Sequence, residues 1–119
     1  MKTDYEFLKT EVDGHILTVT INRPDRMNAL HPPAHAEFDE VWNEFDKDEN
    51  LWVGIVTGEG DRAFSAGNDL KFQAEAGGKM DINMASSGFA GLTSRFNLTK
   101  PLIAAVNGVS MGGGFEIAL

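Results

Sequence analysis

The first third of the chain alternates between apolar and polar residues with the period of a β-strand. Between residues 16 and 21 the odd-numbered positions are all apolar, whereas two of the even-numbered positions are threonine. A second β-rich run precedes this one, and Asp13-Gly14 lies between the two. Because Asp-Gly between two such runs is a strong hairpin signal, the pattern predicts an antiparallel hairpin that ends at Pro24.

The pattern then changes to helical spacing. From Pro32 to Lys47 the apolar residues recur every three or four positions, with acidic residues and histidine on the other face. This predicts an amphipathic helix that packs on a sheet, with Trp42 and Phe45 in the core. We expect His31 and His35 to lie at a solvated helix start, since no metal-binding motif forms around them.

The remaining segments predict strands that alternate with helices. Residues 51–60 and 100–108 read as buried strands, and a short helix with a polar cap is expected to begin at Asn68 or Asp69 and end at Gly77-Gly78. We further expect a mobile loop over 77–88, a helix from Phe89 to Leu98 and the first turns of a helix at the end of the chain. This order is typical of an α/β fold with crossover connections.

Composition and charge exclude several classes of function. The 119 residues carry a formal charge of -8, which disfavours nucleic-acid binding. Cysteine is absent, so thiolate metal sites and cysteine nucleophiles are excluded. No secretory signal is visible and no apolar run reaches the roughly 20 residues that span a bilayer, which indicates a cytoplasmic protein that is not in a membrane.

Two segments share the order strand, glycine loop and helix start: "AFSAGNDLK" and "NGVSMGGGFE". Helix starts present unpaired N–H groups, so two that face one point could stabilise a developing negative charge on an oxygen atom. Tight turns and close packing also require glycine and remain an alternative explanation. Neither segment fits a phosphate-binding or dinucleotide-binding glycine motif.

Glu116 follows the second glycine run closely. A carboxylate at this place could hold a water molecule or move a proton at carbon. A glutamate in the first turn of a helix is also favoured by the helix dipole, so both explanations stay open.

Three motifs in order, "INRPDRMNAL", "AFSAGNDLK" and "KPLIAAVNGVSMGGGFEIAL", resemble the crotonase family of enoyl-CoA hydratases and isomerases. The resemblance implies a spiral of ββα turns, of which residues 1–119 would be the N-terminal part of a single truncated domain. It also implies an acyl-CoA thioester as substrate, with no cofactor beyond the coenzyme A of the substrate and no metal.

The resemblance assigns roles to particular residues. It implies that the backbone N–H groups of Asn68 and Gly113 bind the thioester oxygen and that Glu116 acts in acid–base catalysis. It further implies that substrate is contacted by Arg26, Ala29, Ala66, Asn68, Asp69, Leu70, Lys71, Gly112 and Gly113.

The resemblance leaves the reaction open. Glu116 favours a hydratase or dehydratase, whereas isomerisation and thioester hydrolysis also occur in the family. Members of the family are considerably longer and assemble as trimers or hexamers, so this chain alone could be inactive and serve only to bind coenzyme A or to support assembly.

Overall fold

The structure is a computed structural model, and it describes residues 2–75 and 88–119. The expected helix end at Gly77-Gly78 and residues 77–87 of the expected loop lie outside the described residues. No described helix is long and apolar enough to cross a membrane.

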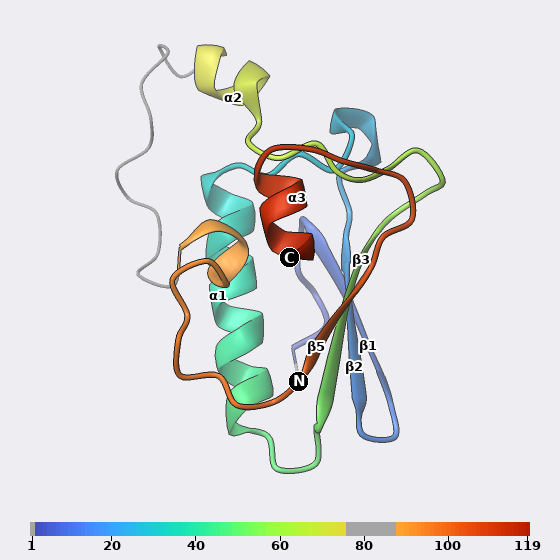
Figure 1. Cartoon of the computed structure of the whole chain (residues 1–119), viewed down its shortest axis with the longest axis vertical. Coiled ribbons are helices and arrows are strands. Elements are labelled where there is room, and N and C mark those ends of the chain that lie inside the picture. Colours follow the sequence, from blue (N-terminus) through green and yellow to red (C-terminus); the bar gives the residue numbers. More distant parts are fainter. Residues whose placement is uncertain (1, 76–87) are drawn as a thin grey trace.

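The main sheet has four strands in the order β1-β2-β3-β5 (Figure 1). Strands β1 (Leu8–Asp13) and β2 (Ile16–Ile21) form the predicted antiparallel hairpin. Strands β3 (Val53–Gly58) and β5 (Leu102–Ala105) add to it in parallel. The mixed sheet with crossover connections confirms the predicted α/β class.

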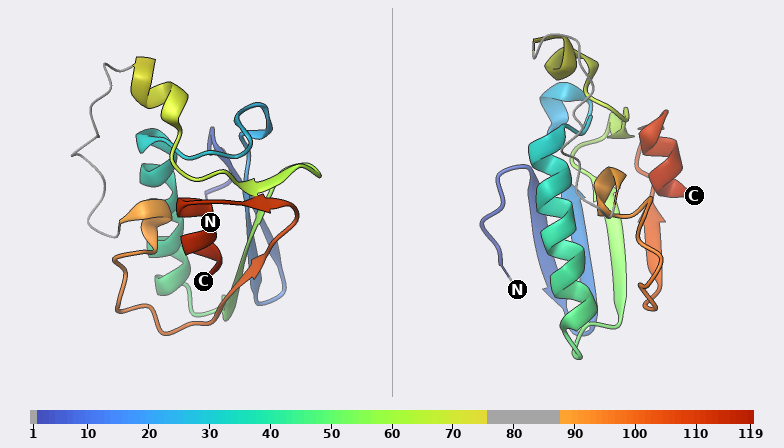
Figure 2. Two further views of the ribbon diagram at one scale, coloured as in Figure 1. Left: turned by 45° about the horizontal axis from the view of Figure 1, so that its top comes forward. Right: turned by 90° about the vertical axis from the view of Figure 1, so that its left-hand side faces the viewer.

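Helix α1 (Pro32–Lys47) lies across one face of this sheet, as Figure 2 shows in both views. Its buried positions follow the predicted stripe, and both Trp42 and Phe45 are fully buried. On the sheet side the odd-numbered residues of β2 are buried, as the alternation predicts. The core therefore lies between α1 and one face of the sheet and is formed mainly by Leu17, Val19, Ile21, Phe38, Val41, Trp42, Phe45 and Val56.

The helix predicted from Phe89 to Leu98 is wrong. Only a single 3-10 turn, η2 (Phe89–Gly91), forms, and Ala90 has a positive φ of 56°. Its N–H donates to Nδ1 of His35 at 3.0 Å, while its carbonyl accepts from Nε1 of Trp42 at 3.0 Å. A positive φ at Ala90 is incompatible with a right-handed helix, and the two hydrogen bonds to side chains of α1 hold Ala90 in this conformation.

The expectation that His31 and His35 are solvated is also wrong. The two residues are 5% and 2% exposed, and His31 packs edge-on against the rings of Phe7 and Phe72. His35 and Trp42 are seven positions apart, so they share one face of α1. This spacing could have placed His35 in the core.

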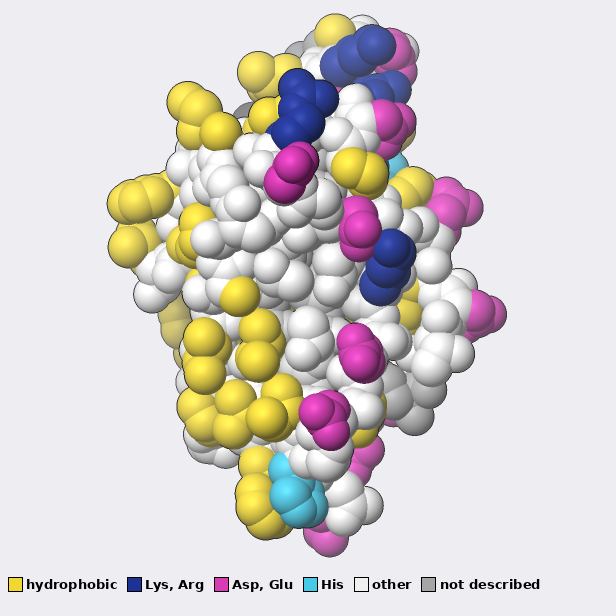
Figure 3. All heavy atoms as spheres, turned by 90° about the vertical axis from the view of Figure 1, so that its right-hand side faces the viewer, with side chains coloured by type: hydrophobic (Ala, Val, Ile, Leu, Met, Phe, Trp, Pro, Cys, Tyr) yellow, Lys and Arg dark blue, Asp and Glu magenta, His cyan; other side chains and the backbone are white. Residues whose placement is uncertain are grey.

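The strand predicted to be buried over 100–108 is half-buried on one face and exposed on the other. Strand β5 is at the edge of the sheet, and Ile103 on its outer side is 52% exposed. Figure 3 looks onto this side of the molecule and shows a band of hydrophobic side chains. The exposed members near β5 and the neighbouring strands are Ile16, Trp52, Ile103, Val106 and Val109.

The two strands expected before the glycine loops are very short, and their pairing into a second, parallel sheet was not predicted. Strand β4 (Ala63–Ser65) pairs with β6 (Val109–Ser110). Helix α2 (Leu70–Glu75) follows β4, and helix α3 (Gly113–Ala118) follows β6. This small sheet sets the relative position of the two glycine loops.

Candidate active site

Both glycine loops start from the small sheet, and Ser65 connects them. The Ser65 hydroxyl accepts the Gly67 N–H at 3.1 Å, and its carbonyl accepts the Met111 N–H at 3.1 Å. A Cβ placed on Gly67 would be only 2.9 Å from the nitrogen of Gly113. The structure therefore brings the two predicted loops side by side.

A different local constraint requires glycine at each of the three consecutive positions 112, 113 and 114. Gly112 has a φ of 52°, which L side chains rarely adopt. A Cβ on Gly113 would lie 2.6 Å from the ring of Phe89, and one on Gly114 would overlap the Ser65 carbonyl. Close packing of the chain on itself accounts for the run, in line with the alternative explanation given above.

The direction of the Asn68 N–H follows from its neighbours. The Leu30 N–H donates to the Gly67 carbonyl at 2.7 Å, and this carbonyl belongs to the same peptide group as the Asn68 N–H. Because a trans peptide is planar, its C=O and N–H point in opposite directions. The Asn68 N–H therefore points away from Leu30.

The backbone N–H groups of Asn68 and Gly113 are alike in their hydrogen bonding. Within residues 2–75 and 88–119, neither N–H donates a hydrogen bond. Gly113 is the first residue of α3, where a helix leaves its N–H groups without partners. Two unpaired donors thus lie in adjacent loops.

Arg26, Ala29 and Ala66 lie beside this pair of loops. The Ala66 N–H donates to the Met27 carbonyl at 3.0 Å, which joins the segment before Leu30 to the first loop. Ala29 is buried, and the side chain of Arg26 is 29% exposed. Ala66 is half-buried, and Arg26 is the charged residue of these three, with a side chain that reaches solvent.

Asp69 confirms the predicted polar cap of α2. It is 4% exposed, and its Oδ1 accepts the Phe72 N–H at 2.9 Å. Its Oδ2 lies 2.9 Å from Nη1 of Arg23 and 3.4 Å from Nη1 of Arg26. Burial raises the pKa of Asp69, but the hydrogen bond from Phe72 and the two guanidinium groups lower it by more than burial raises it. The pKa of Asp69 is therefore below its usual value.

Leu70 and Lys71 are the predicted site residues that stand apart from the loops. Both are on α2, which projects from one end of the molecule in Figure 1, and both are exposed. Leu70 is 71% exposed.

Two asparagines that sequence analysis did not single out hold the loop before β4. The Asn28 amide donates to the carbonyls of Glu59 at 3.0 Å and Ala63 at 2.8 Å. The Asn107 amide donates to Gly58 and also to Ala63, at 3.2 Å. Asn28 has a φ of 54°, a conformation that asparagine tolerates better than most residues, but sequence alone does not identify its partners.

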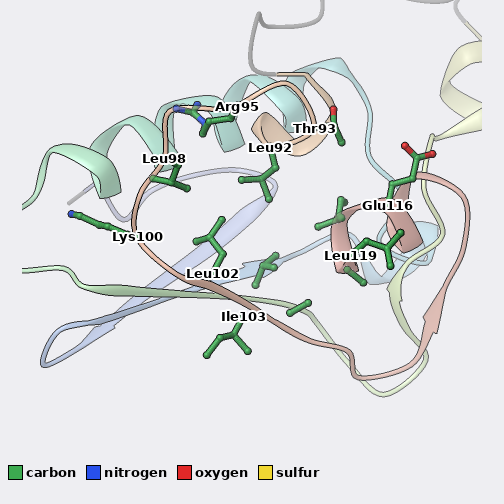
Figure 4. A pocket seen from close by; sticks show the side chains of 13 residues that line it. Leu92, Thr93, Arg95, Leu98, Lys100, Leu102, Ile103, Glu116 and Leu119 are labelled. Carbon is green, nitrogen blue, oxygen red and sulfur yellow. The ribbon is translucent and has the colours of Figure 1, made fainter.

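Glu116 lies at the rim of a cavity of ≈ 340 Å³ (Figure 4). The apolar wall comes from the segment before β5, from β5 itself and from α3, and includes Leu92, Leu98 and Leu102. Figure 4 shows the Glu116 carboxylate turned away from Leu102. It is the single carboxylate among the described residues that line this cavity, so a partner acid would have to come from elsewhere.

His31 lies close to the ion pair of Arg23 and Asp69 beside the first loop. Burial lowers the pKa of His31 to about 4, and the positive charge of Arg23 lowers it as well. Its Nδ1 is buried and has no hydrogen-bond partner in the described part of the chain. Among the described residues no three acidic or histidine side chains gather as a metal site would require.

The fold and the paired glycine loops define the enoyl-CoA hydratase/isomerase class. The model of that family matches residues 11–119, and the chain belongs to this family. The carnitinyl-CoA dehydratase of Escherichia coli is 49% identical over 114 residues. That match covers 96% of this chain and 43% of the relative.

Solved structures agree with this assignment. An enoyl-CoA hydratase from Mycobacterium tuberculosis matches with a TM-score of 0.82 and 37% identity, covering 95% of this chain and 42% of that one. A carnitinyl-CoA dehydratase from Mycobacterium avium also matches with a TM-score of 0.82, at 35% identity, covering 93% and 43%. These matches confirm the predicted crotonase-like fold, and the chain spans less than half the length of these relatives.

Proposed function

We propose that this chain is part of an enzyme that adds water to, or removes it from, an α,β-unsaturated acyl-CoA thioester. The observation that carries the proposal is the pair of backbone amides at Asn68 and Gly113, which belong to adjacent loops and donate no hydrogen bond within the described residues. The name of the Escherichia coli relative, carnitinyl-CoA dehydratase, supports a hydratase-type reaction.

In this proposal the two amides bind the carbonyl oxygen of the thioester. When a bond forms or breaks at Cβ, electron density moves to this oxygen and an enolate develops. Donors that are fixed in place before the reaction stabilise this charge, and each is typically worth about 3 kcal/mol in the transition state. No metal or further cofactor takes part in the proposed step.

Glu116 has the acid–base role in the proposed reaction. During hydration, the oxygen of water forms a bond to Cβ and a proton is delivered to Cα, so that the double bond becomes a hydroxyl group and a C–H bond. Dehydration reverses both steps. We assign to the Glu116 carboxylate the binding and deprotonation of the water molecule, and a second acid–base group, outside the described cavity, would serve Cα.

Coenzyme A would extend from the thioester past the first loop. Arg26, the partly exposed cation beside the loop, and Lys71, the exposed one on α2, are the cations that we propose for its phosphates. We further propose that the whole protein is a cytoplasmic homotrimer or hexamer.

A second candidate concerns this chain by itself. The chain spans 43% of its Escherichia coli relative, and one carboxylate lines the described cavity. The 119 residues alone would then bind an acyl-CoA without turnover, or support assembly. Calorimetry with acetyl-CoA, together with a turnover assay on the same sample, distinguishes binding alone from catalysis.

The test of the main proposal uses a full-length protein that contains this sequence. We expect hydration of crotonyl-CoA and dehydration of carnitinyl-CoA, and a fall in kcat of about a hundredfold or more in Glu116→Gln. Glu11→Gln, which changes an exposed carboxylate on β1, is the matched control. Unchanged turnover in Glu116→Gln would refute its role, and product analysis showing only isomerised or hydrolysed thioester would refute the hydratase reaction.

A further inference from the structure

A buried ion pair lies directly beside the proposed oxyanion donor. Arg23 and Asp69 are 8% and 4% exposed, and their charged groups are 2.9 Å apart. Asp69 is the residue after Asn68, so anything that fixes Asp69 also restrains the Asn68 peptide. The resemblance to the family groups Asp69 with residues that contact substrate, yet its carboxylate is occupied by partners from this chain.

All the polar groups of Asp69 are used in this way. Its N–H donates to the Leu30 carbonyl at 2.9 Å, and its own carbonyl accepts the Gln73 N–H at 3.0 Å. The carboxylate accepts from the Phe72 N–H on one oxygen and faces Arg23 on the other, and it also lies 3.4 Å from Nη1 of Arg26. Residue 69 is thereby joined to α2 and to the segment that contains Leu30.

Arg23 fixes the other side of the same contact. Its Nη1 also donates to the Ala29 carbonyl at 2.6 Å, and its N–H donates to Oδ1 of Asn28. Leu30 follows Ala29 in the sequence. Its N–H and its carbonyl form hydrogen bonds with the two peptide groups that flank Asn68. The ion pair therefore joins two segments where Leu30 sets the direction of the Asn68 N–H.

We propose that Arg23 and Asp69 are positioning residues, which hold the Asn68 N–H toward the thioester oxygen without touching the substrate. The catalytic consequence rests on the proposed function, since an oxyanion donor that rotates by a small amount loses its advantage in the transition state before it loses binding of the ground state. A displacement of about 1 Å can cost a hundredfold in rate.

The kinetic test compares Asp69→Asn with wild type in the full-length protein. Asparagine keeps the size of the side chain and an acceptor for Phe72, but it removes the charge that holds Arg23. We expect kcat to fall tenfold to a hundredfold, in line with the loss of part of an oxyanion donor, while KM changes by less than about threefold. Asp25→Asn, an exposed carboxylate in the same segment, is the control and should keep both constants.

Two results would overturn the inference. One is an unchanged kcat in a folded Asp69→Asn protein, and the other is a rise in KM at constant kcat, which would place the role of Asp69 in substrate binding, either directly or through Arg26. If Asp69→Asn does not fold, the double variant Arg23→Gln/Asp69→Asn removes both charges, so that the ion pair is lost and neither of its charges stays buried without the other. The double variant should fold and still show the reduced kcat, and full activity in it would equally overturn the inference.

A measurement without substrate separates this inference from the proposed function. In nitrogen-15 spectra of the 119-residue chain, Asp69→Asn should shift the Asn68 amide signal, lower its order parameter and speed the hydrogen exchange of the residue 69 amide. If these changes appear while the full-length wild type transforms no acyl-CoA, the proposed function fails and the positioning role stands. If wild type is active and the Asn68 signal is unchanged in Asp69→Asn, the positioning role fails.

Discussion

The burial of His31 makes a quantitative prediction for stability against pH. Its pKa is lowered from 6.5 in the unfolded chain to about 4 in the folded one, so the folded state holds the imidazole neutral. Below pH 6.5 the unfolded state binds a proton that the folded state does not. Stability therefore decreases as the pH falls toward 4, and this contribution levels off below that value.

The size of the effect follows from the same two values. The shift in the pKa of His31 corresponds to about 3 kcal/mol of unfolding free energy. About 2 kcal/mol of this should be lost between pH 7 and pH 5. Asp69, whose pKa is also lowered, contributes with the same sign at lower pH, because the folded state resists its protonation. Between pH 6.5 and 5 the contribution of His31 to the loss of stability is best separated from that of Asp69.

The assay is urea unfolding of the chain at several pH values between 7 and 4, followed by circular dichroism at low protein concentration. His31→Asn removes the titrating group, so its curve of unfolding free energy against pH should be flatter than that of wild type, whatever its stability at pH 7. His15→Asn removes an exposed imidazole and should retain the decrease that His31 causes. Parallel curves for wild type and His31→Asn would refute the reasoning.

Two further variants test the packing of the loops and of the sheet. Gly67→Ala should lower the free energy of unfolding by at least about 2 kcal/mol, because Gly67 has a φ of 94° and a Cβ there would lie 2.8 Å from the Met111 carbonyl. Gly60→Ala, with a φ of 87° and open space around the Cβ, isolates the backbone strain, and an equal loss in both would exclude the contact as a cause. We expect the chain to self-associate through the apolar band along β5, and Ile103→Lys to shift its sedimentation toward the monomer. Ala36→Lys adds the same charge on α1 and should leave association unchanged, whereas equal effects would point to net charge instead.

Periodic patterns made the large elements predictable. The hairpin around Asp13-Gly14 and the helix from Pro32 to Lys47 each extend over enough residues for alternation or helical spacing to be visible. The three ordered motifs also predicted the family. In each of these cases the sequence pattern that carries the prediction lies within a run of consecutive residues.

The parts that were missed depend on contacts between distant residues. The turn at Ala90 replaces a helix because two side chains of α1 bind its backbone, and nothing in the segment itself reports this. The strands β4 and β6 are too short to show a period. The exposure of Ile103 depends on which strand is at the edge of the sheet, which the strand's own residues do not determine.

The residues of the candidate site could be predicted from the sequence, but their arrangement in space could not. The first loop, the second loop and Glu116 were each expected from sequence, and their positions relative to one another became visible only in the structure. The roles of Arg23 and Ser65 were not expected, since an arginine and a serine in a loop have many possible partners.

The pairing of β4 with β6 has a consequence for the way this protein folds. Ala63 and Val109 come together across a long stretch of intervening chain, as Gly54 and Leu102 do where β3 pairs with β5, and closing loops of this size costs entropy that the few hydrogen bonds of β4 and β6 repay poorly. The hairpin and α1 can form earlier from contacts nearby in sequence. The contact between the two glycine loops should therefore form late in refolding, after the hairpin and α1, and be lost early under mild denaturation.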